Sequence, residues 1–204
     1  MMQQTAVLSE AELAACASLL RKGSTNAVAG LSQMLGQPYS VRAISARRMP
    51  ARETVNLVGG REKTVVGVYL AISGDASGHM LLMYKPQTAY SLVDCLMGNT
   101  PGTCTRLGEM EGSAIGEMGN IVGAFFLNAL SDATGLNLQP SPPAVMLDRA
   151  GSIMDALTPH ILESSDTAVV LETTFGAELT QATGAFFVLP TVSFIRALLS
   201  RGAR

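Results

Sequence analysis

The sequence repeats itself, and the repeat limits the folds that it can form. The segment LSQMLG at residues 31–36 aligns with LSDATG at 130–135, and each closes a long helical pattern with a glycine suited to the C-terminal cap. Later parts of the two units also correspond. In each unit, two apolar stretches separated by a turn are followed by a proline and an apolar helix. These stretches cover 65–72, 78–84 and 86–96, and again 169–175, 184–189 and 190–199.

The repeat predicts an α+β fold. We expect a pseudo-twofold internal duplication of helix, strands and helix, with long helices packed on a largely antiparallel β-sheet. The chain is interpreted as one domain over residues 1–204, made of two repeats at approximately 8–100 and 107–200.

The helix expected over 113–130 separates polar from apolar residues. At about 100° per residue, one stripe is mainly polar and the opposite stripe is apolar. The polar stripe consists of Ser113, Glu117, Asn120, Ala124, Leu127 and Ser131. Gly116, Gly119 and Gly123 interrupt the helix, and each costs about 1 kcal/mol relative to alanine. Close approach by another surface would explain the glycines, whereas an acid and an amide alone indicate only a solvated face.

Composition and charge exclude several classes of function. The chain has 204 residues, of which 48% are hydrophobic, enough for one sizeable core. A net charge of −2 and a pI near 5.7 give no basic surface for nucleic acid or for an acidic membrane. Cys16, Cys95 and Cys104 form no CxxC pair, which favours a reducing compartment. With no signal peptide or membrane span either, the sequence predicts a cytoplasmic protein without nucleic-acid or membrane partners.

The chain carries no pattern typical of a metal or nucleotide site. Its two histidines stand apart from each other and from the cysteines, and no GxGxxG or GxxxxGK[ST] run occurs. We therefore expect no cofactor and no metal bound by this chain. The segment 42–64, with its clustered arginines, is interpreted as a solvated connection, with a partner-facing loop as the alternative.

The segment 113–143 contains a four-position pattern. Ser113 is followed after three residues by Glu117, after two more by Asn120, and after twenty-two more by Pro143. This pattern resembles the signature of the CheC / CheX / FliY family of chemotaxis phosphatases, and so do the runs EMGNI at 117–121 and NALSDATG at 128–135. The resemblance implies a CheC-like fold.

The first repeat lacks the acid and the amide. Aligning the repeats places Ser18 and Arg21 at the positions of Glu117 and Asn120. The chain is therefore most like a CheC protein with a single active site, and its first site is degenerate.

The resemblance implies a hydrolase, a protein phosphatase that acts on the phospho-aspartate of a CheY-type response regulator in two-component signalling. Asn120 would orient the attacking water, since its amide offers an acceptor and two donors. Glu117 would contact a lysine of the regulator. Mg²⁺ is expected on the phosphorylated regulator and not on this chain.

The remaining residues of this segment have supporting roles by the same resemblance. Ser113 would be a peripheral partner contact, and Gly116 and Gly123 would let the partner's loops approach the helix. Leu127 would add apolar contact at the rim, and Pro143 is interpreted as a structural position of the motif.

A non-catalytic role stays open. Proteins of this family associate with the receptor deamidase CheD or belong to the flagellar switch, so an adaptor that acts through CheD or the switch is the alternative. The intact set from Ser113 to Pro143 favours catalysis, and a chain ending without an appended C-terminal module disfavours the switch. A CheX-like dimer also stays open, although duplication within one chain lets two repeats cover each other's sheet edges.

Overall fold

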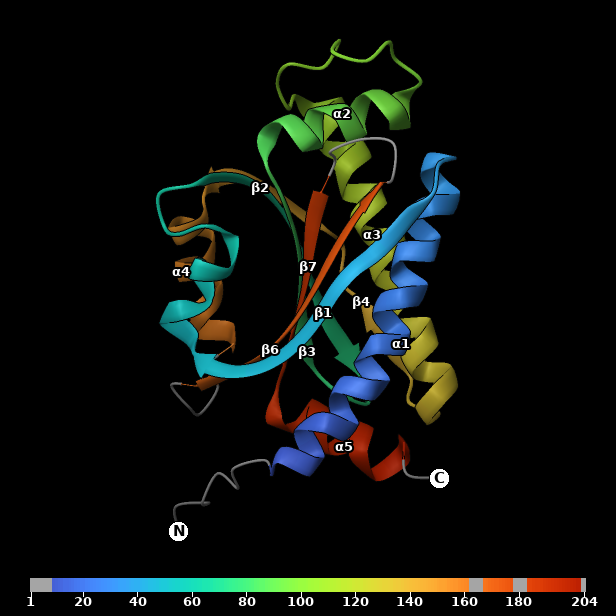
Figure 1. The fold of residues 1–204 in the computed structure, drawn as a ribbon, viewed down its shortest axis with the longest axis vertical. Coiled ribbons are helices and arrows are strands. Elements are labelled where there is room, and N and C mark those ends of the chain that lie inside the picture. The colour runs from blue at the N-terminus through green and yellow to red at the C-terminus, as the bar shows by residue number, and fades with distance from the viewer. Residues whose placement is uncertain (1–8, 162–166, 178–182, 203–204) are drawn as a thin grey trace.

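The computed structural model describes residues 9–161, 167–177 and 183–202 (Figure 1). Within these residues the chain forms five α-helices, one 3₁₀ helix and seven strands. The first half contains α1 (Glu10–Leu35), β1 (Tyr39–Pro50), η1 (Ala51–Val58), β2 (Thr64–Gly74), β3 (Gly78–Tyr84) and α2 (Pro86–Met97). The second half contains α3 (Glu109–Thr134), β4 (Leu138–Pro140), β5 (Ala144–Arg149), α4 (Ala150–Ile161), β6 (Thr167–Ala177), β7 (Thr183–Pro190) and α5 (Val192–Gly202).

The described strands form one sheet in the order β1-β6-β7-β3-β2, and β4 and β5 follow one another along the outer edge of β2. All pairings are antiparallel. The order has pseudo-twofold symmetry, because β3 pairs with β7 at the centre while β1 of the first half borders β6 and β5 of the second half borders β2. The central register has the same symmetry: Gly78 pairs with Pro190, and Tyr84 pairs with Gly184. The predicted α+β fold with its internal duplication is confirmed.

Helices cover both faces of the sheet. α1 and α3, each of 26 residues, lie side by side and antiparallel on one face, and α4 lies with η1 on the other (Figure 1). β3 is buried on both sides: Met80 and Leu82 belong to the core under α1 and α3, whereas Leu81 and Met83 belong to the core under α4. Burial of alternate residues on opposite faces explains why this strand contains the uninterrupted apolar run from Met80 to Tyr84.

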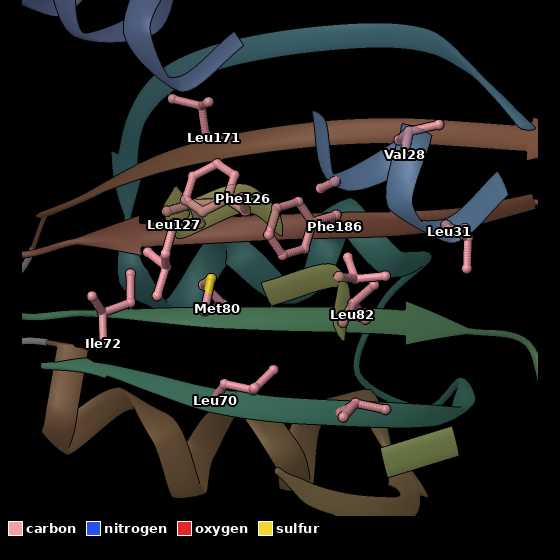
Figure 2. Close-up of a cluster of buried hydrophobic side chains, with 14 of the residues drawn as sticks. Val28, Leu31, Leu70, Ile72, Met80, Leu82, Phe126, Leu127, Leu171 and Phe186 are labelled. Carbon is pink, nitrogen blue, oxygen red and sulfur yellow. The ribbon is translucent and has the colours of Figure 1, made fainter. Parts of the chain in front are cut away.

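The larger core joins the two long helices to the sheet. In Figure 2, Phe126 of α3 and Phe186 of β7 lie against each other, with ring centroids 5.2 Å apart and nearly perpendicular rings. The helices themselves approach closely, because a Cβ on Gly23 of α1 would lie 2.7 Å from the Phe126 ring. The Nδ2 group of Asn26 donates to the carbonyl oxygen of Phe125 at 2.7 Å, which ties α1 to α3 at their crossing.

The segment 42–64 is not a simple connection. Its first part belongs to β1, which pairs with β6 along its length, and η1 follows. Arg47 of β1 forms an ion pair with Glu172 of β6 at 2.6 Å, so a charged side chain here belongs to a regular strand. Among the helices that the structure describes, none is both long and apolar enough to span a bilayer.

Candidate active site on α3

The helix α3 begins with a well-formed N-terminal turn. Gly108 is the N-cap residue in an extended conformation, and its N–H donates to Oε2 of Glu111 at 3.0 Å. Glu109 and Glu111 place negative charge in the first turn, which the helix dipole favours. The motif residues Ser113, Glu117 and Asn120 follow immediately, in the N-terminal half of the helix.

The acid and the amide of the motif face outward. Ser113 and Glu117 are exposed, and Asn120 is partly buried. Glu117 and Asn120 are three residues apart, which places their side chains next to each other on the helix surface. Neither side chain forms a hydrogen bond or ion pair with any residue that the structure describes. The pair is therefore available to an incoming partner.

Three of the glycines of α3 face the protein itself, so the prediction that they admit a partner is wrong for Gly116 and Gly123. A Cβ on Gly116 would lie 3.3 Å from Cγ2 of Val145 in β5, and one on Gly123 would lie 3.1 Å from Cε of Met80. Gly119 is tighter still, since its Cβ would lie 2.5 Å from Cγ1 of Val68 in β2. The three glycines let α3 lie directly on the sheet.

Leu127 does not lie at the rim of an exposed face, so this prediction is also wrong. Its side chain is 0% exposed and belongs to the core cluster, and Figure 2 shows it beside Met80 and Ile72. Leu127 is about 80° from Glu117 around the helix axis. At that angle it falls at the border between the outward and the sheet-facing sides of the helix, and the neighbouring elements bury it.

Pro143 lies beside the motif helix. Its Cγ would be 3.5 Å from a Cβ on Gly116, the residue that precedes Glu117. The link between β4 and β5 is fixed to β2, because the Ala71 N–H donates to Oγ of Ser141 at 2.9 Å and the Ser141 N–H donates to the Ala71 carbonyl at 2.8 Å. The fold thus brings the distant fourth position of the motif to the first three.

Two exposed apolar residues flank this surface and were missed in the sequence. Met110, 69% exposed, extends the outward stripe of α3 by one turn before Ser113. Leu147, 46% exposed, lies on β5 on the same face as Val145, which packs at Gly116. Extending the helical stripe towards its N-terminus would have identified Met110.

Other chemistry is poorly supported in the described residues. Nowhere in residues 9–161, 167–177 and 183–202 do three or more His, Cys, Asp or Glu side chains gather as metal ligands would. His79 is largely buried, with its Nδ1 2.9 Å from the Tyr69 hydroxyl oxygen, and its ring stacks on that of Tyr69. Burial raises the pKa of the Cys16 thiol to about 11, which makes it a poor nucleophile.

The model of the CheC-like family matches residues 110–147, the segment that holds Ser113, Glu117, Asn120 and Pro143. The chain is 30% identical over 153 residues to the CheY-P phosphatase CheC of Bacillus subtilis (strain 168), an alignment that covers 74% of this chain and 73% of that protein. The chain belongs to the CheC-like family.

Solved structures of other proteins share the fold. FliY of Thermotoga maritima has a TM-score of 0.75 and 19% identity, covering 97% of this chain and 98% of that one. A chain of the FliG–FliM complex from H. pylori has a TM-score of 0.64 and 14% identity, covering 95% of this chain and 100% of that one. At these identities the likeness establishes the CheC-like architecture alone.

Proposed function

We propose that this protein is a phosphatase that hydrolyses the phospho-aspartate of a CheY-type response regulator in chemotaxis signalling. The observation that carries the proposal is the outward pair Glu117 and Asn120, whose side chains have no partner among the described residues. A solvated helix face would also leave them unpaired, but this pair lies within the family match and beside Pro143. The relative from Bacillus subtilis is itself a CheY-P phosphatase.

The chemistry requires little from this chain beyond placing a water molecule. In hydrolysis, the water oxygen bonds to phosphorus while the bond from phosphorus to the aspartate oxygen breaks. The bonding electrons leave with the carboxylate, and the two protons of the water leave with the inorganic phosphate. The regulator's own lysine and Mg²⁺ stabilise the phosphoryl oxygens, so catalysis depends on holding the water in line. The carboxamide of Asn120 offers the acceptor and donors that this task needs.

Glu117 positions the partner. Its exposed carboxylate accepts a charge-assisted hydrogen bond from the regulator's lysine. The attraction between the two charges becomes stronger as the interface excludes water. Ser113 contacts the partner's periphery one turn before Glu117, and Met110 supplies apolar contact that the buried Leu127 does not. Gly116 and Gly123 act indirectly, by seating α3 on the sheet.

The test separates binding from chemistry. Phosphate release from phosphorylated regulator is followed with wild type, Asn120→Ala, Glu117→Gln and Asn128→Ala, the last an exposed asparagine on the same helix as a matched control. We expect Asn120→Ala to lower kcat by about 100-fold with KM nearly unchanged. Glu117→Gln should mainly raise KM, and Asn128→Ala should behave as wild type. Full activity of Asn120→Ala would refute the proposal.

A binding role without catalysis is the second candidate. It is favoured by the fold, which recurs in the FliG–FliM complex, and by the first repeat, where Ser18 and Arg21 stand in place of the acid and the amide. The same assay tests it, because an adaptor would bind the regulator, CheD or a switch protein without accelerating phosphate release.

A further inference from the structure

A shallow groove, wide open to solvent, runs between α1 and α3 on the side of their crossing away from Glu117 and Asn120. Its volume is about 650 Å³. Arg21, Lys22, Thr25 and Asn26 line it from α1, and Asp132 lies on the opposite wall with two alanines of α3. Arg21 is the residue that the repeat places at the position of Asn120. The groove therefore lies where a second active site would be.

The groove is open because the two repeats differ in bulk at this crossing. Phe125 of α3 lies over Gly30 of α1, where a Cβ would be 2.6 Å from its ring, and this ring fills the crossing on the side of Asn120. The pseudo-twofold axis exchanges Phe125 with Asn26 and Gly30 with Ala129. Asn26 is smaller than phenylalanine, and its amide is held by the Phe125 carbonyl at 2.7 Å. Among the described residues, no side chain equivalent to the phenylalanine ring covers the groove.

The charges in the groove differ from those of the Glu117 site. Arg21 and Lys22 are exposed, and neither side chain pairs with an acid within the described part of the chain. Asp132, across the groove, also lacks a salt-bridge partner among the described residues. The walls thus carry one more positive than negative charge, beside the hydroxyl of Thr25 and the amide of Asn26.

We propose that this groove binds an acidic segment of a partner polypeptide, which meets Arg21 and Lys22 with its carboxylates. An exposed cation gains only about 0–1 kcal/mol from a single carboxylate, so one small anion is held weakly. A segment that carries several carboxylates gains more, because after the first contact the others form at a high effective concentration. Asp132 sets the register, since it repels a carboxylate placed opposite it and favours a neutral or basic residue there.

Binding in the groove uses neither Glu117 nor Asn120, so it is independent of the proposed phosphatase activity. The probe is a fluorescein-labelled hexaglutamate peptide, measured by fluorescence anisotropy at low salt, where exposed charges are least screened. We expect Arg21→Glu combined with Lys22→Glu to weaken binding at least tenfold, equivalent to about 1.4 kcal/mol. The control is Lys85→Glu combined with Arg106→Glu, which replaces two exposed cations outside the groove and changes the net charge by the same amount. This control should keep most of the affinity for the peptide.

A variant that leaves the charge unchanged separates the effect of the groove's shape from the effect of its charge. Ala133→Phe, at an exposed position on the groove wall, fills the space and should also weaken binding. Circular dichroism of every variant verifies that the fold is retained. The proposal is overturned if hexaglutamate does not bind wild type, if both double variants bind equally, or if millimolar inorganic phosphate displaces the peptide as well as free hexaglutamate does.

Discussion

Replacing Gly119 with alanine would measure how closely the site helix is seated on the sheet. The new Cβ would lie 2.5 Å from Cγ1 of Val68, whereas ordinary contact begins at 3.4 Å, so the helix or the valine must move by about 0.9 Å. Over-packing of this kind costs about 1–3 kcal/mol. Alanine returns about 1 kcal/mol through helix propensity, which offsets part of the cost.

Gly112→Ala is the matched control, because a Cβ there meets nothing within 4 Å on the same helix. Both variants gain the same propensity, so the difference between their free energies of unfolding isolates the contact with Val68, at about 1–3 kcal/mol. The chain has no tryptophan, so urea unfolding is followed by far-UV circular dichroism. A difference of 2 kcal/mol separates the midpoints by about 1 M urea. If Gly119→Ala were as stable as Gly112→Ala, the close seating of α3 would be refuted.

Four further predictions concern buried side chains. Leu127→Ala should lower the free energy of unfolding, measured in urea, by about 2–5 kcal/mol without raising KM for the regulator. A raised KM with unchanged stability would instead identify Leu127 as a partner contact. Tyr84→Phe should match wild type or gain about 1 kcal/mol in thermal unfolding, because the buried hydroxyl has no hydrogen-bond partner in the described chain; a clear loss would contradict this. Burial raises the pKa of Cys16 from 9.0 to about 11, so iodoacetamide at pH 8 should modify exposed Cys95 first, as mass spectrometry would report. By linkage, the stability from the protonated Cys16 thiol is complete below pH 9 and is lost as the pH rises to about 11; a Cys16→Ala variant whose alkaline unfolding matches wild type would contradict this.

The hairpins and their following helices were predictable because their apolar runs are bounded by clear breaks. The run 78–84 and the proline at 86 mark β3 and the start of α2 at the residues where the structure has them. β1 was not predictable, since its arginines suit a solvated connection as well as a strand whose side chains are half-buried. Only pairing with β6, a segment far along the chain, decides between the two.

The outward face of α3 was predictable in its centre and not at its margins. Glu117 lies in the middle of the polar stripe, and its exposure follows from helical spacing alone. Leu127 lies at the border, where the neighbouring elements decide burial. The glycines correctly indicated that another surface approaches the helix closely, but their spacing in the sequence does not say which surface it is. The sheet of the same chain does so at Gly116, Gly119 and Gly123.

The exchange of outer strands has a consequence for how the two halves depend on each other. β1 of the first half is bordered by β6, and β5 of the second half is bordered by β2, so neither half contains all the neighbours of its own strands. Cleavage in the link between α2 and α3 would leave two fragments with open sheet edges. Such fragments should reassociate in a concentration-dependent way, and halves from two different molecules would fit together as well as halves from one.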